Sequence, residues 1–159
     1  MSDDTDVRTL IAEVERQERD LRFATFTNDD AWELGSALVA AARADRLPVA
    51  ITITRNAHRL FAAALTGATP DNDTWLARKS AVVHRFGHSS LYVRQASVER
   101  GTTFEAEFGL SPQRYAAHGG AFPVLVRSVG AVGVVALSGL PQLDDHRRVV
   151  AALRAHLAR

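Results

Sequence analysis

The sequence contains no cysteine. Disulfide bonds, thiolate metal sites and thiol catalysis are therefore excluded, and the composition fits a reducing compartment. Long apolar runs are also missing, because no stretch approaches the ~20 residues that span a bilayer. The N-terminus carries Asp3, Asp4 and Asp6 where a secretory signal peptide would have an apolar segment. We therefore expect a cytoplasmic protein without a membrane partner.

Strong net charge is lacking as well. The formal net charge is +1, which is too small to indicate a nucleic-acid-binding protein. The charge is nevertheless uneven, since residues 1–20 hold seven acidic residues and three arginines, a net of −4. Lysine is almost absent: of the 19 basic residues only Lys79 is a lysine, and it lies inside the segment 71–90, where most of the candidate site residues fall.

The elements that are present predict one ordinary α/β (α+β) domain. A length of 159 residues with 47% hydrophobic and 23% charged residues indicates a single domain over 1–159. A β-branched run predicts a strand at 49–54, with 58–65 as its partner across a turn, and further strands are expected at 21–26, 122–127 and 131–137. Because consecutive strands form hairpins, we expect a mostly antiparallel sheet of about five strands with helices packed on it.

Helical spacing of apolar residues predicts five helices. They cover 5–19, from Thr27 or Asn28 to about 47, from Asp71 or Asn72 to Phe86, from Ser89 or Ser90 to about 100, and from Asp144 onward. The second helix is expected to bury an apolar face made of Trp32, Leu34, Leu38, Val39 and Ala42. Between 101 and 120 we expect irregular chain with a short turn of helix at Ser111-Pro112.

One stripe of the helix before Gly87 combines apolar residues with the lysine. Trp75, Lys79, Val82 and Phe86 are spaced i, i+4, i+7 and i+11, so they share a face. In one interpretation the Lys79 stem covers apolar surface and its ammonium reaches water or an acid. In the other the stripe lines a pocket, and Lys79 binds an anionic group of a ligand.

Two arginines share a flank of the same helix. Arg78 and Arg85 could clamp a carboxylate or phosphate with bidentate hydrogen bonds, or they could form a solvated face with nearby acids. The run Asp71-Asn72-Asp73 is more typical of helix capping than of a ligand site.

The histidines of this segment do not predict a metal site. His84 and His88 are spaced i, i+4, but Gly87 interrupts the helix between them and the glutamate of H-E-x-x-H is absent. A bend in which His88, Ser89 and Ser90 hydrogen-bond the exposed backbone is the favoured interpretation. We therefore expect no resident metal.

The tripeptide His118-Gly119-Gly120 precedes a predicted strand. Tandem glycines permit positive φ and a close backbone approach, which serves either a ligand or a tight turn. Neither a phosphate-binding G-x-G-x-x-G nor the nucleophile motif G-x-S-x-G occurs. Gly130 and Gly133 are interpreted as hairpin and packing glycines.

Two stretches resemble a known family. The segment DNDTWLARKSAVVHRFGHSS (71–90) and the segment HGGAFPVLVRSVGAVGVVALSGLPQLDDH (118–146) are similar to signatures of the haem-degrading-domain family, the GlcG/HbpS-like group, in its bacterial and fungal branch. The resemblance covers the chain from about Phe23 to its end. It implies a profilin-like three-layer α/β/α sandwich, a homo-oligomer, and binding of haem or a comparable small molecule, but no settled reaction. The residues themselves do not predict haem, since there is no C-x-x-C-H motif.

Three hypotheses about function follow. The leading one is a small-molecule-binding protein whose pocket holds an anionic or amphipathic ligand. The second is an enzyme of unassigned reaction, with His88, His118 and Lys79 as candidate acid/base groups. The third is an oligomeric scaffold without a small ligand. The candidate ligand-binding residues are Trp75, Arg78, Lys79, Arg85, Phe86, His88, Ser89, His118, Gly119 and Gly120.

Overall fold

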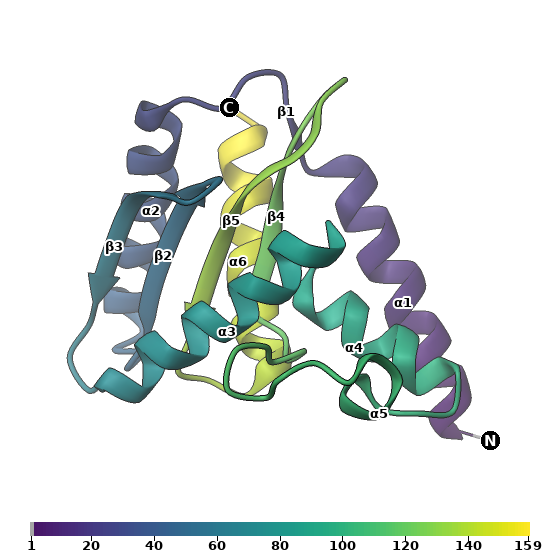
Figure 1. Cartoon of the computed structure of the whole chain (residues 1–159). Helices are drawn as coiled ribbons and strands as arrows, with labels where there is room; N and C mark the ends of the chain where they lie inside the picture. The colour runs from purple at the N-terminus through teal and green to yellow at the C-terminus, as the bar shows by residue number, and fades with distance from the viewer. Residues whose placement is uncertain (1) are drawn as a thin grey trace.

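The structure is a computed structural model that describes the backbone of residues 2–159 and the side chains of residues 6–159. The chain contains both helices and strands, including two hairpins separated by three consecutive helices (Figure 1). In order they are α1 (Ser2–Asp20), β1 (Arg22–Phe23), α2 (Asn28–Ala44), β2 (Ala50–Arg55), β3 (His58–Ala64), α3 (Pro70–Phe86), α4 (Ser90–Glu99), α5 (Phe104–Phe108), β4 (Ala121–Val126), β5 (Gly130–Ser138) and α6 (Gln142–Leu157). None of the described helices is both long enough and apolar enough to cross a membrane.

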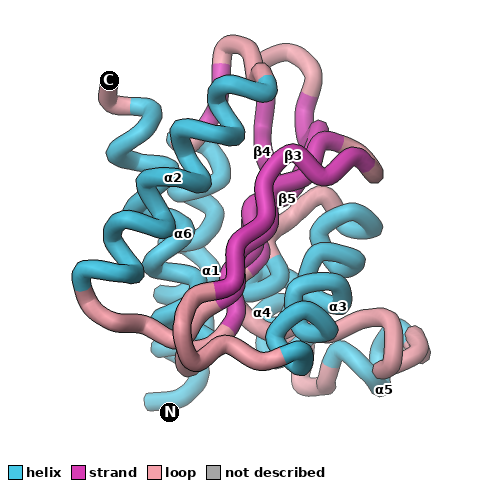
Figure 2. Tube along the Cα trace, turned by 90° about the vertical axis from the view of Figure 1, so that its left-hand side faces the viewer, coloured by secondary structure: helices cyan, strands magenta, loops and turns pink. Residues whose placement is uncertain are grey.

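The five strands form one sheet in the order β1-β4-β5-β2-β3. All neighbouring pairs are antiparallel except β1 with β4, which is parallel and only two residues long. Helices α2 and α6 pack on one face of the sheet and α3 packs on the other, as the view along the sheet shows (Figure 2). This arrangement confirms the predicted three-layer sandwich with a mostly antiparallel sheet.

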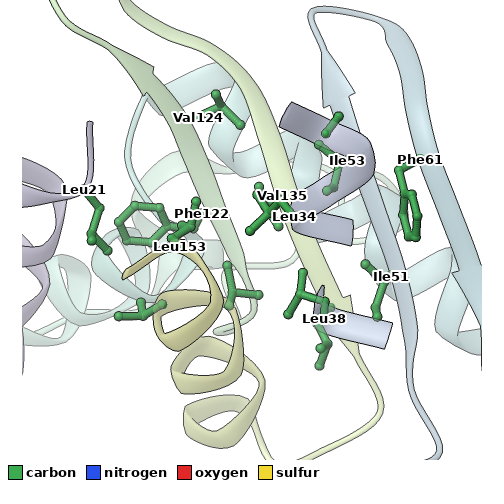
Figure 3. Close-up of a cluster of buried hydrophobic side chains, with 14 of the residues drawn as sticks. Leu21, Leu34, Leu38, Ile51, Ile53, Phe61, Phe122, Val124, Val135 and Leu153 are labelled. Atoms are coloured by element: carbon green, nitrogen blue, oxygen red, sulfur yellow. The ribbon is translucent and has the colours of Figure 1, made fainter. Parts of the chain in front are cut away.

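The largest core lies between the sheet and the layer formed by α2 and α6 (Figure 3). Leu34 and Leu38 of α2 and Leu153 of α6 meet inward-facing strand residues such as Ile51 and Phe122, and all are at most 3% exposed. Each such side chain contributes roughly 1.5–3 kcal/mol through burial. This core fixes the sheet on which the opposite face is built.

The apolar face of α2 is narrower than the sequence predicts. Leu34, Leu38 and Ala42 are buried as expected, but Trp32 is 65% exposed, so its predicted burial is wrong. The buried stripe of α2 runs through Ala31 and Gly35 instead. Gly35 lies so close to the Phe61 ring that a Cβ there would be 2.5 Å from it, and Trp32 packs edge-on against the outer side of the same ring. The tryptophan is therefore left at the rim of the core.

One local prediction fails in the stretch before β4. The single turn expected at Ser111-Pro112 forms, since the Ser111 carbonyl accepts hydrogen bonds from the Arg114 amide at 3.1 Å and the Tyr115 amide at 3.0 Å. The short helix α5 at Phe104–Phe108 lies where only irregular chain is expected. Thr103 begins α5 by accepting a hydrogen bond from the Ala106 amide, and Gly109 ends it in the left-handed region. Elsewhere differences are small: β1 is shorter than 21–26, and α6 begins at Gln142 instead of Asp144.

The first residue of β4 is held by a side chain from α4. The Ser90 hydroxyl accepts a hydrogen bond from the Ala121 amide at 3.1 Å and donates one to the Ala121 carbonyl at 3.3 Å. Ser90 is fully buried, and Ser89 before it caps α4 through the Tyr92 amide. One hydroxyl therefore satisfies both backbone groups of Ala121 on this side of the strand.

Candidate functional site

A cavity of about 340 Å³ lies where α3, the loop before β4 and the turn from β5 to α6 meet. We call it the α3 cavity. Its volume is at the lower end of the range of ligand pockets. The residues that line it are Asp71, Asn72, Trp75, Lys79, His118, Gly119, Ser138, Gly139, Leu140, Gln142 and Asp145. The N-terminal half of segment 71–90 and the first two residues of His118-Gly119-Gly120 are therefore brought together, although they are some forty residues apart in sequence.

The first turn of α3 forms one wall. Thr69 precedes the helix, Pro70 occupies its first position, and the Asn72 side chain accepts a hydrogen bond from the Thr69 amide at 2.8 Å. Asn72 also donates to the Ser138 hydroxyl at 3.3 Å, which links α3 to the end of β5. The capping interpretation thus holds for Asn72, but the helix starts one residue earlier than predicted, and Asp71 faces the cavity.

Lys79 is the most deeply buried charged group of the site, with 2% of its side chain exposed. Its ammonium donates to the Gly119 carbonyl at 3.1 Å, to the Leu137 carbonyl at 2.7 Å and to the Asp145 carboxylate at 3.2 Å. These three acceptors match the three N–H groups of an ammonium. Lys79 therefore binds the protein's own wall, and its donors are not free for a ligand.

The partner of Lys79 is equally enclosed, with 4% of the Asp145 side chain exposed. Burial lowers the pKa of Lys79, and the Asp145 carboxylate opposes that shift. Burial raises the pKa of Asp145, against the opposing effects of Lys79 and of the Leu140 and Gly139 amides. Asp145 also accepts a hydrogen bond from the Leu140 amide at 3.0 Å. One carboxylate thus joins α3 to the turn that precedes α6.

The paired glycines allow this close packing. Gly120 has φ +129°, and a Cβ on it would be 2.4 Å from the Lys79 Nζ and 2.5 Å from the Leu137 carbonyl oxygen. A Cβ on Gly119 would be 2.4 Å from the Gln142 carbonyl oxygen, and its amide donates to the Gln142 side chain at 3.0 Å. The close backbone approach predicted at these glycines is therefore made to Lys79 and α6.

His118 and Trp75 form the aromatic part of the lining. Their rings meet edge-to-face with centroids 5.1 Å apart, and the imidazole is half-buried. Burial lowers the pKa of His118, and the positive charges of Arg94, Lys79 and Arg78 lower it further, whereas Glu105 opposes them. Both effects favour the neutral form of the imidazole, which lies in a positive electrostatic environment.

Arg78 borders the same aromatic pair from outside the cavity. Its guanidinium carbon lies 4.5 Å from the centroid of the Trp75 ring, and its Nε donates to the Pro112 carbonyl at 2.9 Å. Arg85, seven residues later, lies 5.8 Å from the centroid of the Tyr115 ring. Each guanidinium is thus placed against a different aromatic ring, and the structure does not bring the two arginines together into one clamp.

The remaining candidates from the sequence lie away from the α3 cavity. Phe86 shares a helical face with Trp75, but eleven residues along a helix separate them by about 16 Å, and Phe86 packs against Phe104 and Phe108 instead. His88 follows the left-handed residue Gly87 and binds Glu18 of α1. Ser89 caps α4 and donates its amide to the same carboxylate at 2.7 Å.

Sequence reasoning missed the wall supplied by the turn from β5 to α6. Ser138, Gly139, Leu140, Gln142 and Asp145 line the cavity, but none of them was a candidate. One signal was available, because a lysine buried on an apolar helical stripe needs an acidic partner. The adjacent pair Asp144-Asp145 supplies one in the segment that also carries the family resemblance.

Comparisons with known proteins agree with this architecture. The family model described as "Haem degrading protein HbpS-like" matches residues 26–154. A UPF0303 protein of Streptomyces coelicolor is 57% identical over 143 residues, which cover 90% of either chain. The crystal structure of the Ybr137w protein has a TM-score of 0.84 and 36% identity, covering 91% of this chain and 86% of that one.

A more distant structure shares the fold alone. The crystal structure titled "PduOC:Heme Complex" has a TM-score of 0.65 and 20% identity, covering 82% of this chain and 94% of that chain. The family model spans most of the sequence, and it includes nearly all of the sheet and the whole lining of the α3 cavity. The chain therefore belongs to the HbpS-like haem-degrading protein family.

Proposed function

We propose that this chain binds a small planar molecule with anionic groups at the α3 cavity, and that haem is the ligand to test first. The observation that carries the proposal is the half-buried imidazole of His118, which lines the cavity edge-to-face with Trp75 and whose pKa is lowered by burial and by nearby positive charges. The description of the family and the haem complex of a protein with the same fold support the choice of haem.

The residues of the lining fit the parts of a haem. A neutral imidazole is a common axial ligand of haem iron, and His118 is the histidine that lines the cavity. The Trp75 ring offers an apolar, aromatic surface to a macrocycle. Arg78 and Arg94, whose charges act on His118, suit the carboxylates of the ligand. Haem would supply redox-active iron, whereas these residues would bind and orient it.

The size of the cavity limits how a haem can be held. A volume of about 340 Å³ encloses part of a tetrapyrrole, so the rest of the macrocycle would extend beyond the cavity. Lys79 is not assigned to the ligand's carboxylates, because Asp145 and two carbonyls already occupy its donors. Because its donors are occupied, Lys79 is also not a free acid/base group for the hypothesis that the chain is an enzyme. No other contact among the described residues supports that hypothesis. Assembly into a homo-oligomer stays a prediction.

The proposal is tested by titrating the protein with haem and following the Soret band. We expect a saturable shift for the wild type and for His84→Ala, and roughly tenfold or greater weakening for His118→Ala. His84 is a matched control because it is an exposed histidine on α3, outside the cavity lining. Equal binding by both variants, or no saturable shift for the wild type, would contradict the proposal.

A further inference from the structure

A second group of polar side chains lies on the opposite face of the sheet from the α3 cavity, between α2 and α6. Asp30 and Glu33 are one turn apart in α2, and His156 belongs to the last turn of α6. One ligand atom from each of the three lies within 4.8 Å of those of the other two. Two carboxylates and an imidazole form a donor set that divalent transition metals accept in proteins.

His156 is the least exposed member, with 9% of its side chain accessible. Its Nε2 lies 3.5 Å from the Asp30 Oδ1, whereas His88 and His146 each have a ring nitrogen 2.7 Å from an oxygen. The longer separation is poor for a charge-assisted hydrogen bond. It is close to the ~3.4 Å expected between two ligands on a tetrahedral ion with bonds of about 2.0–2.1 Å.

The two less exposed donors, Asp30 and His156, are oriented by their surroundings. Asp30 Oδ2 accepts hydrogen bonds from the Thr27 amide at 2.8 Å and the Thr27 hydroxyl at 3.0 Å, because Asp30 completes the capping box of α2. Its Oδ1 is the oxygen that faces His156. The His156 ring packs against Phe23 with centroids 5.7 Å apart. In metal sites the carboxylates that bind the ion typically accept hydrogen bonds from neighbouring groups, as Asp30 does from Thr27.

Glu33 is the most exposed member of the group, and it already has a partner. Its side chain is about half exposed, and its Oε2 is 3.0 Å from Nη1 of Arg159. Its ligand atom lies within 4.8 Å of the other two, so a side-chain rotation that brings it at most about 1.4 Å closer would complete the donor set at the distances of a metal site. The arginine competes with a cation for that carboxylate, so it lowers the affinity of the group for metal.

We propose that Asp30, Glu33 and His156 form a binding site for a divalent transition metal ion of the zinc type. Three protein ligands leave a fourth position for water or another ligand. The imidazole nitrogen favours zinc, cobalt or nickel over magnesium and calcium, which take oxygen ligands. The ion would link the start of α2 to the end of α6, where a cation also complements the helix dipole of α6.

The proposal is tested by titrating the full chain with Co²⁺ and reading its visible absorption, followed by displacement with Zn²⁺. We expect one equivalent to bind saturably to the wild type and to His58→Ala, a control at an exposed histidine of β3. Glu33→Gln and His156→Asn should each weaken binding about tenfold or more. Because Glu33 is exposed, Glu33→Gln remains informative even if His156→Asn fails to fold.

A substitution of the competing arginine tests the same site in the opposite direction. Arg159→Ala frees the Glu33 carboxylate and should strengthen Co²⁺ binding severalfold. If Glu33 served only to pair with Arg159, the affinity for Co²⁺ would not change. The proposal is overturned if the wild type shows no saturable Co²⁺ absorption, or if Glu33→Gln binds as the wild type does.

Discussion

Segment 71–90 makes two ion pairs to distant elements, but in different surroundings. Lys79 in the middle of α3 pairs with Asp145 of α6, and both side chains are almost fully removed from water. His88 near the end pairs with Glu18 of α1, but 47% of the His88 side chain is exposed. Solvent screens the second pair and not the first. We therefore expect the first pair to govern folding and the second to respond to pH.

The largest effect is expected from breaking the buried pair. Lys79→Met leaves the Asp145 carboxylate buried without its cation, which costs about 3–5 kcal/mol of unfolding free energy. Urea unfolding measures this loss. The double variant Lys79→Met/Asp145→Asn removes the charge while keeping an acceptor for the Leu140 amide, and it should recover much of the stability. A single variant within about 1 kcal/mol of the wild type would contradict this view.

A smaller effect is expected from adding a methyl group beside each of the two pairs. Gly120→Ala places Cβ 2.4 Å from the Lys79 Nζ at a φ of +129°, so it should cost more than about 2 kcal/mol. Gly87→Ala is the matched control, since Gly87 has φ +71° but nothing within 4 Å of the added Cβ. It should cost only about 1 kcal/mol, from the left-handed backbone alone. Equal urea midpoints for both variants would show that the cavity wall tolerates movement.

The smallest effect is the pH dependence at His88. The hydrogen bond to Glu18 raises the pKa of His88 against the opposing effect of burial. The stabilisation is therefore complete below the unfolded pKa of about 6.5 and is lost as the pH rises through the higher folded pKa. Because His88 is half-exposed, we expect less than about 1 kcal/mol. The stability difference between wild type and Glu18→Gln should be larger at acidic than at alkaline pH, and a constant difference would refute this.

The strands and most helices could be predicted because their signals are local. β2, β4 and β5 follow runs that contain several Val, Ile or Thr residues, or Val with other apolar residues, and β3 follows β2 after a short turn; the two hairpins fix the pairing of β2 with β3 and of β4 with β5. By contrast, α5 is five residues long, too short to show a helical period, although Thr103 and Gly109 are its capping residues. Trp32 was misplaced because a close contact between Gly35 and Phe61, 26 residues apart, narrows the buried face.

The candidate site was predictable only in part for the same reason. Trp75 and Lys79 could be placed on one wall by helical spacing, and the glycines before β4 by their residue type. The pairing of Lys79 with Asp145 joins residues 66 positions apart, and no local pattern encodes it. Helical spacing shows which residues share a face but not how far along the helix a pocket extends. Phe86 was therefore a candidate, although it packs on α5.

The hydroxyl of Ser90 protects the part of β4 that has no neighbouring strand. β1 is two residues long and pairs only with Leu125 and Val126, so the start of β4 is left without a partner on that side. By occupying both outward backbone groups of Ala121, the Ser90 hydroxyl closes the start of β4 against pairing with any incoming strand. At the far margin β3 is bordered on one side only, by β2. The outer strands of the sheet are β1 and β3, so another chain could add main-chain hydrogen bonds there but not at Ala121, whose backbone groups are already occupied.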